Sequence, residues 1–274
     1  MNPSVPLLIV TPTLGTSPFL SATVASVAAL GLPEVEHLLV APAANVPALQ
    51  SRYPKVGVVA DDGRAGGIYG ALNAGLRQAV AGWEWFTYIN DDDLLLPGFC
   101  EVFRQAARGA DPASVTYGNV ELIDEAGRRV GLSTVERQPA RFPALLQAGI
   151  SPLMQQGMLF HRRCVERLGH FDLRYRNCAD LDFWLRAYVS GEIFRYYDLP
   201  VAQFRLRRGQ LSGNTALTVR EQTAIVRRLL PRTLAAGRRR LTVWRYRMIN
   251  LPRYVLRLRH AGFVTSYRML ESSR

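Results

Sequence analysis

Short apolar runs rich in β-forming residues alternate with helical stretches through the N-terminal part of the chain. The strand-like runs cover residues 7–11, 36–40, 56–60 and 83–89, and the helical stretches cover 19–30 and 70–80. This alternation predicts βαβ units and an α/β fold with a doubly wound, mainly parallel, Rossmann-like sheet. In such sheets ligands bind beyond the carboxyl ends of the strands, so we expect a site in the loops after Thr11, Ala60 and Ile89.

The second half of the chain is less regular. Residues 115–117 and 120–123 have the composition of strands with a turn at 124–127, and residues 164–168 and 181–188 have helical spacing. Prolines interrupt residues 132–150, which we expect to be irregular. The chain of 274 residues is long enough for one large domain and an appendage.

Charge divides the chain into two parts. Residues 205–274 contain 17 arginines and two acidic residues, a net charge of +15, whereas residues 1–204 carry a net charge of −3. We predict a domain at 1–215 and a basic helical tail at 216–274, divided by Pro231 and Pro252 into two or three helices. Arginines interleaved with leucine, valine and tryptophan suit an anionic membrane surface. They fit a helical cap that packs its apolar face on the domain equally well.

The N-terminus and the cysteines bear on location. Residues 1–4 carry no positive charge cluster, and the apolar run that follows is too short for a signal peptide. No stretch reaches the roughly 20 consecutive apolar residues of a membrane-spanning helix. Three cysteines without metal-ligand spacing fit free thiols in a reducing compartment. We therefore expect a cytoplasmic protein, peripheral on the inner face of the cell membrane if the tail binds lipid.

Three adjacent carboxylates, Asp91-Asp92-Asp93, follow the aromatic run at 83–89. Acidic runs at strand ends are usually turns or helix caps. Here the run lies between two apolar segments, where mutual repulsion raises the free energy of the carboxylates unless a cation compensates. A hard divalent cation that also binds phosphate oxygens fits that role. The pattern therefore indicates a site for Mn²⁺ or Mg²⁺.

Two further carboxylates, Asp180 and Asp182, lie at the start of the helical stretch 181–188. Capping of the helix explains either residue taken alone, because free N–H groups and the helix dipole favour acids in a first turn. Two acids leave one free to act as a general base towards a hydroxyl, and the spacing does not decide which. A glycine-rich loop at 61–73 can also bind phosphate, although it matches neither the P-loop nor the Rossmann pattern.

Together these segments resemble the family 2 glycosyltransferases, which are inverting enzymes of the GT-A fold, and most closely the bacterial polysaccharide-biosynthesis type. The resemblance covers roughly residues 5–215. It rests on VTPTLG (10–15), GIYGALNAGL (67–76), YINDDDLLLPGF (88–99), YGNVELID (117–124), RRCVERLGHFDLRYRNCADLDFWLR (162–186) and YYDLPVAQFR (196–205). It implies a nucleoside-diphosphate sugar as donor, a divalent metal, and a glycan or lipid-linked acceptor. No nucleic-acid partner is expected.

The family motifs assign roles to individual residues. Asp92 matches the metal-binding aspartate, with Asp93 as a second candidate ligand and Asp91 as a donor contact. Asp180 matches the catalytic base and is favoured over Asp182. The other positions that correspond to donor contacts are Thr11, Pro12, Thr13, Asp62 and Asn73.

The chain departs from the family where the second strand ends. Ala41 and Pro42 replace the usual acidic loop, so the motifs do not determine which nucleotide the donor carries. A sugar nucleotidyltransferase also has a metal-binding α/β site, but its N-terminal glycine-rich loop usually carries a basic residue that residues 10–19 lack. A catalytically inactive domain that docks lipid or nucleic acid through the tail is the second alternative, against which Asp92 and Asp180 argue.

Overall fold

The apolar run at residues 7–11 forms the central strand of the parallel half of the sheet. The computed structural model describes residues 6–61, 63, 67–80, 82–108, 113–207, 210 and 215–261. Strand β1 (Leu7–Pro12) pairs in parallel with β2 (Val35–Ala41) and β4 (Trp85–Tyr88), and β3 (Gly57–Ala60) pairs in parallel with β2. The carboxyl ends of these strands therefore lie at one edge of the sheet.

The second half of the sheet is mixed. The strand order is β3-β2-β1-β4-β8-β6-β9-β5, with β7 beside β6. β8 (Leu159–His161) is antiparallel to β4 and β6 (Val115–Ile123), whereas β9 (Phe194–Arg205) is parallel to β6. β5 (Leu94–Leu95) pairs with β9, and β7 (Arg129–Leu132) forms a hairpin with β6. The predicted α/β fold is confirmed, with most parallel pairing in the N-terminal half.

Helices cover both faces of the sheet. Leu7 and Ile9 of β1 belong to a core shared with α1 (Leu20–Ala28) and α4 (Pro97–Ala107). Leu8 and Val10 belong to a core shared with α3 (Gly67–Gln78), α6 (Arg162–Leu168) and α7 (Ala179–Val189). Covered on both faces, β1 is buried at every position, which explains its continuous apolar sequence. A Cβ at Gly75 of α3 would lie 2.8 Å from Val10 Cγ1, so the glycine permits the close approach of helix and strand.

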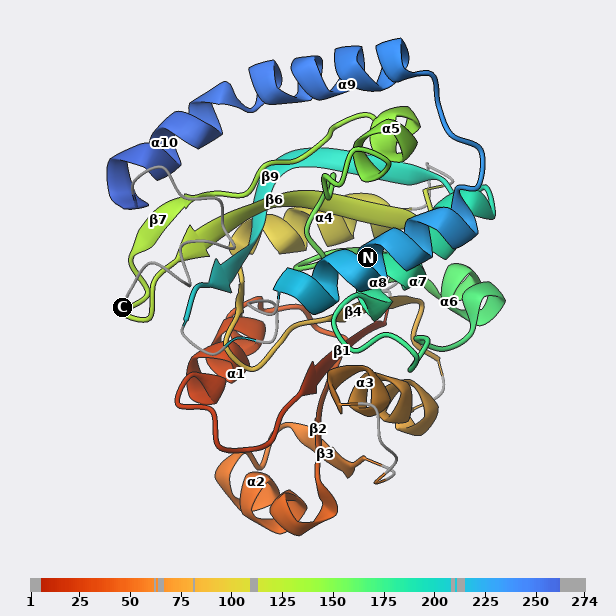
Figure 1. The fold of residues 1–274 in the computed structure, drawn as a ribbon. Coiled ribbons are helices and arrows are strands. Elements are labelled where there is room, and N and C mark those ends of the chain that lie inside the picture. The colour runs from red at the N-terminus through yellow and green to blue at the C-terminus, as the bar shows by residue number, and fades with distance from the viewer. Residues whose placement is uncertain are drawn as a thin grey trace.

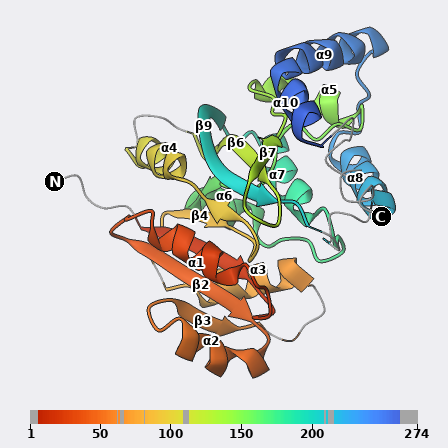
Figure 2. The same ribbon diagram turned by 90° about the vertical axis from the view of Figure 1, so that its left-hand side faces the viewer.

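The C-terminal part is mainly helical over the described residues 215–261, as predicted. α8 (Thr215–Leu229) packs on α7, α9 (Ala236–Ile249) packs on α5 (Phe142–Leu146), and α10 (Leu251–Ala261) packs on β7. Figures 1 and 2 show α9 and α10 along the rim of the molecule, at the end away from β3 and α2 (Val46–Arg52). A 3-10 turn at Ala43–Asn45 precedes α2. No helix in the described part of the chain is long and apolar enough to cross a membrane.

One expectation about the middle of the chain was wrong. Residues 132–150 contain a 3-10 turn at Pro139–Arg141 followed directly by α5. Pro139 and Pro143 lie in the first positions of these helices. Proline is tolerated there because the N–H that it lacks has no partner within the helix. The prolines therefore begin helical turns instead of breaking them.

Candidate active site

A cavity of about 880 Å³ opens at the carboxyl edge of the parallel strands. The loops after β1, β3 and β4, which the sequence singled out, all contribute to its wall, with Pro12, Thr13, Asp61, Asp91 and Asp92. α3, the start of α7 and the segment after β9 contribute Tyr69, Asn177, Asp180, Arg207 and Gln210. Ligands bind at this edge in doubly wound sheets, so the cavity is the candidate active site.

Two carboxylates after β4 reach the cavity. Asp91 Oδ2 accepts a hydrogen bond of 2.6 Å from the hydroxyl of Thr13. Asp92 is 5% exposed, and its Oδ2 lies 2.5 Å from Nε of Arg207. Burial raises the pKa of Asp91, and the charge of Asp92 raises it further, against the Thr13 hydrogen bond. The two carboxylates form a negative site that a cation stabilises, and Arg207 supplies a positive charge in this structure.

Asp93, the second candidate metal ligand, does not line the cavity. Its side chain is fully buried and accepts hydrogen bonds from the backbone N–H of Arg205 at 2.9 Å and from Nε2 of Gln156 at 3.0 Å. Burial raises the pKa of Asp93 well above the ordinary value. Asp93 therefore ties the end of β9 to the loop after β4.

Asp91 and Asp92 are not part of a larger cluster of metal-ligating side chains among the described residues. Within the described ranges, no group of three or more His, Cys, Asp or Glu side chains is arranged to hold a metal ion. Mg²⁺ in nucleotide sites is often held by one or two carboxylates together with substrate phosphates and water. Asp91 and Asp92 lie together in the cavity and already attract a cationic side chain, so they fit a cation held in that way.

Asp180 reaches the cavity from the first turn of α7. The hydroxyl of Tyr69 lies 3.0 Å from Asp180 Oδ1 and 3.0 Å from the backbone oxygen of Asn177, so one proton is shared between two acceptors. Burial raises the pKa of Asp180, whereas the N–H of Leu181 and the Tyr69 hydroxyl lower it. Among the described residues, no cationic side chain pairs with Asp180. A carboxylate in this state is suited to accept a proton.

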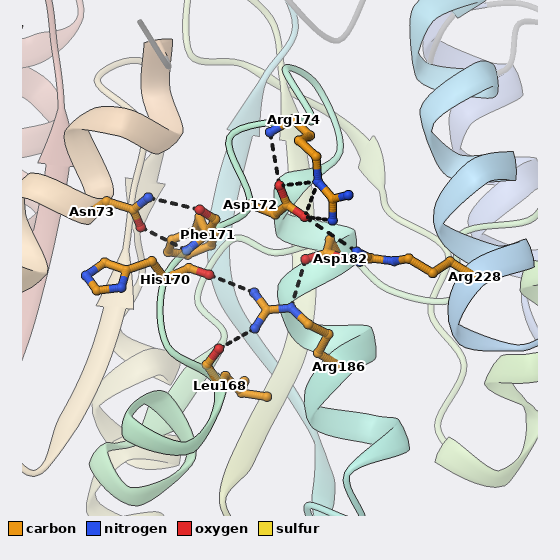
Figure 3. A network of polar contacts seen from close by, with 9 residues as sticks. All are labelled: Asn73, Leu168, His170, Phe171, Asp172, Arg174, Asp182, Arg186 and Arg228. Carbon is orange, nitrogen blue, oxygen red and sulfur yellow. Dashed lines mark hydrogen bonds and ion pairs between the residues drawn. The ribbon is translucent and has the colours of Figure 1, made fainter. Parts of the chain in front are cut away.

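Asp182, the other candidate base, lies outside the cavity. Its fully buried carboxylate lies between Nε of Arg186, at 2.8 Å, and the guanidinium of Arg228 from α8 (Figure 3). Arg186 also donates to the backbone oxygens of Leu168 and His170. A carboxylate neutralised by two arginines joins α7 to its neighbours and has no access to a ligand in the cavity.

Three donor contacts were predicted in the loops after β1 and β3, and two of them are found in the cavity wall. Pro12 and Thr13 line the cavity. Asp62 lies outside the described residues. Its neighbour Asp61 lines the cavity and accepts a hydrogen bond of 3.0 Å from the N–H of Gly63.

Two other predicted donor contacts are buried away from the cavity. The hydroxyl of Thr11 lies 3.0 Å from Nε2 of His37 on the neighbouring strand β2. The amide of Asn73 exchanges two hydrogen bonds, of 2.8 and 2.9 Å, with the backbone of Phe171 (Figure 3). Thr11 and Asn73 therefore hold β1 and α3 in place, and neither side chain lines the cavity.

Several residues at the site had no role in the sequence-based prediction. Tyr69 and Arg207 contact the two acidic groups directly. Gln155 lines the cavity, and both polar atoms of its amide are buried without a hydrogen-bond partner in the described structure. Glu221 of α8 accepts hydrogen bonds from three successive backbone N–H groups, those of residues 176–178, at 2.9 to 3.0 Å. In the sequence, Glu221 stands out by its negative charge, because it is one of only two acidic residues in the basic tail.

The fold and the site together define a class of protein. A doubly wound sheet carries acidic groups after β4, and a partly buried carboxylate on α7 faces the same cavity. Such a cavity accommodates an anionic nucleotide ligand beside a proton acceptor. These are the parts of a glycosyltransferase of the GT-A fold.

The comparisons with known proteins agree with this class. The model of glycosyl transferase family 2 matches residues 8–169, more than half of the chain, so the chain belongs to this family. A PGL/p-HBAD biosynthesis glycosyltransferase of Mycobacterium tuberculosis (strain ATCC 25177 / H37Ra) is 26% identical over 196 residues, 64% of this chain and 72% of the relative. The protein is therefore a glycosyltransferase.

Solved structures share the fold at low sequence identity. S. aureus TarS 1–349, in complex with UDP-GlcNAc, is 16% identical with a TM-score of 0.60, over 98% of this chain and 91% of that one. The Pyrobaculum calidifontis mannosyltransferase PcManGT, in complex with GDP-Man and Mn²⁺, is 14% identical with a TM-score of 0.52, over 98% and 87%. Glucosyl-3-phosphoglycerate synthase from M. tuberculosis, in complex with Mg²⁺ and UDP, is 15% identical with a TM-score of 0.56, over 84% and 81%.

Proposed function

We propose that this chain transfers a sugar from a nucleoside-diphosphate sugar to an acceptor hydroxyl, with inversion at the anomeric carbon and with Asp180 as the general base. The observation that carries the proposal is the contrast between the carboxylates. Among the described residues, Asp180 faces the cavity and accepts hydrogen bonds only from a hydroxyl and the backbone, whereas Asp182 is enclosed by two arginines.

The transfer follows from a single displacement. Asp180 accepts the proton of the acceptor hydroxyl while the hydroxyl oxygen forms a bond to the anomeric carbon. The bond from that carbon to the diphosphate oxygen breaks with its electron pair, so the nucleoside diphosphate leaves and the configuration inverts. The hydrogen bond from Tyr69 stabilises the ionised form of the base and fixes its orientation.

The leaving group carries negative charge, and the acidic pair after β4 is suited to bring a cation to it. Asp92, with Asp91 beside it, would hold the divalent cation together with phosphate oxygens of the donor. When bound, Mn²⁺ or Mg²⁺ supplies positive charge that stabilises the departing diphosphate. Solved relatives of the fold with GDP-Man and Mn²⁺, or with UDP and Mg²⁺, support a donor and metal of this kind.

The acceptor and the location are also proposals. We infer a glycan or lipid-linked acceptor used in cell-surface polysaccharide synthesis, with the chain peripheral on the inner face of the membrane. The resemblance of the motifs to bacterial polysaccharide-type members supports the first part. The net charge of +15 over residues 205–274 supports the second, because anionic lipids attract basic segments.

The base assignment is tested with Asp180→Asn. Because the amide accepts no proton, we expect kcat to fall by roughly 10²- to 10⁴-fold. Donor binding, measured by calorimetry with Mn²⁺, is expected to stay within about twofold, since the donor site lies at the strand ends. Glu166→Gln is the matched control: it makes the same change at an exposed carboxylate of α6, where a surface ion pair contributes little. Near-normal kcat in Asp180→Asn would refute the assignment.

The identity of the product distinguishes the proposed activity from its alternatives. Incubation of the wild-type chain with a panel of nucleotide sugars, Mn²⁺ and candidate acceptors is expected to release nucleoside diphosphate. Formation or consumption of pyrophosphate would instead indicate a sugar nucleotidyltransferase. Tight binding of a nucleotide sugar with no turnover on any acceptor would favour an inactive binding domain.

A further inference from the structure

The last two described helices, α9 and α10, turn an unusual face towards the body of the protein. Their buried positions recur at helical spacing, but they are polar: Thr242, Tyr246, Asn250, Arg253 and Arg257. The Asn250 amide exchanges two hydrogen bonds of 3.1 Å with the backbone of Val135. Arg253 donates to the backbone oxygen of Ser133 at 2.6 Å. α9 and α10 are therefore attached to the domain largely by hydrogen bonds.

Most of the exposed large apolar side chains described in the same helices lie on the opposite side; Ile249, 44% exposed, is the one outside this group. Five of them, each between 40% and 61% exposed, are Leu241, Trp244, Met248, Leu251 and Val255. Their spacing of three and four residues places them in one stripe along the helices. Figures 1 and 2 show that no other described element lies beyond α9 at this rim. A helical cap that stabilised the domain by burying its apolar face would have the reverse orientation.

Arginines flank the apolar stripe on both sides. At 3.6 residues per turn, Arg240 and Arg247 lie along one edge of the stripe, and Arg238 and Arg245 lie along the other. All four side chains are exposed. α9 and α10 contain no Asp or Glu. We name the outward stripe with these four arginines the docking face.

We propose that the docking face binds the surface of an anionic lipid bilayer, with α9 and α10 lying in the plane of the interface. The apolar stripe enters the boundary between headgroups and acyl chains, and the arginines pair with lipid phosphates on either side. Trp244, the most exposed member of the stripe, is of the residue type enriched at that depth. The inference rests on the peripheral location proposed above and names the surface that provides it. Vesicle binding tests it separately from the transfer chemistry, which the released product tests.

Charge favours a bilayer over the other occupants of such a face. A two-fold contact between copies of this chain would bring the same four arginines together, and like charges facing each other are unfavourable. Nucleic acid would pair with the arginines, but its phosphates offer nothing to a central stripe of five exposed apolar side chains. An anionic bilayer satisfies the apolar and the positive parts at once.

Co-sedimentation of the full chain with vesicles tests the proposal. We expect recovery with vesicles of phosphatidylcholine mixed with phosphatidylglycerol, weak recovery with phosphatidylcholine alone, and loss of binding at high salt. The double variant Leu241→Gln/Trp244→Gln is expected to bind the mixed vesicles at least roughly tenfold more weakly, because two large apolar side chains no longer enter the interface. Arg240→Gln/Arg247→Gln should lose affinity for the mixed vesicles only.

Val219→Gln is the matched control, since Val219 of α8 is 62% exposed but lies outside the docking face. All variants alter exposed positions, so unchanged melting temperatures are expected and separate binding from folding. Equal recovery of the wild type in the supernatant with and without mixed vesicles would overturn the proposal. Normal vesicle binding by the Leu241/Trp244 variant would also overturn it. The same holds if the wild type forms a dimer that this variant dissociates, or if the wild type binds RNA and not vesicles.

Discussion

Asp180 and Asp182 are two residues apart in one helical turn, yet their surroundings give them different chemistry. Asp182 is fully buried and its charge is neutralised by Arg186 and Arg228. Asp180 is held by the Tyr69 hydroxyl instead. A base must exchange a proton with a ligand, and Asp180, which has no cationic partner among the described residues, fits the role proposed for it. The two arginines pair with Asp182 and leave Asp180 available for the proposed catalysis.

The pKa of Asp180 leads to a prediction about pH. Burial raises this pKa, and the base acts in its ionised form, so kcat is low while Asp180 is protonated and rises as the pH passes through the raised pKa. We expect the rising limb of kcat against pH above the range of an ordinary carboxylate. Tyr69→Phe removes a hydrogen bond that lowers the pKa, so the limb should move to still higher pH. A limb that moves to lower pH in Tyr69→Phe would contradict this account.

At the scale of elements, the start of α7 is held in place by α8. The N-cap residue of α7, Cys178, makes no capping hydrogen bond with its side chain. Glu221 of α8 accepts from the backbone N–H groups of residues 176–178 instead. A carboxylate near a helix N-terminus is also favoured by the helix dipole. Glu221 thereby fixes the loop from which Asp180 projects, although it lies in the predicted tail at 216–274.

This contact predicts a kinetic effect of Glu221→Gln. The side-chain NH₂ group of the new glutamine would face the backbone N–H groups of residues 176–178, and two donors do not form a hydrogen bond. The loop should therefore relax, and Asp180 should lose its orientation. We expect kcat to fall roughly 10- to 100-fold, with the KM for the donor within about twofold, because small displacements of a catalytic group cost rate more than binding. Arg220→Gln, on the exposed side of the same helix, should behave as wild type. A folded Glu221→Gln variant with unchanged kcat, or with an effect on donor KM alone, would show that the loop does not depend on Glu221.

The elements differ in how far the sequence predicts them. The parallel half of the sheet follows from the pattern because strands buried on both faces are continuously apolar, as in β1. Strand β9 lacks such a signal, since buried, half-buried and exposed positions are mixed along it. The sequence also predicts the position of the cavity, because the cavity lies at the ends of these strands. It does not show which carboxylate faces the cavity, because Asp93 and Asp182 are removed from it by partners 112 and 46 residues away, Arg205 and Arg228.

At the scale of the whole molecule, the cavity joins two parts of the fold. The parallel strands supply Thr13, Asp91 and Asp92, whereas α7 and the segment after β9 supply Asp180 and Arg207. The groups proposed to bind the donor and the proposed base therefore come from regions more than 80 residues apart. The contact between Arg207 and Asp92 also joins the two regions, across 115 residues. A ligand that contacts both parts stabilises their arrangement, so donor binding and the stability of the fold are linked.

The proposed cation site predicts that metal and nucleotide binding depend on each other, because the described residues contain no cluster of three or more metal-ligating side chains. Asp91 and Asp92 alone would hold a free cation weakly, but a nucleoside diphosphate would add phosphate oxygens to the ligand set. We therefore expect UDP or GDP with Mn²⁺ to raise the melting temperature by about 5–10 °C at a concentration near 100 Kd, and either component alone to raise it much less. EDTA, or Asp92→Asn, should remove the joint effect while the chain stays folded. An equal shift with Mn²⁺ alone would show instead that the protein completes a metal site without the nucleotide.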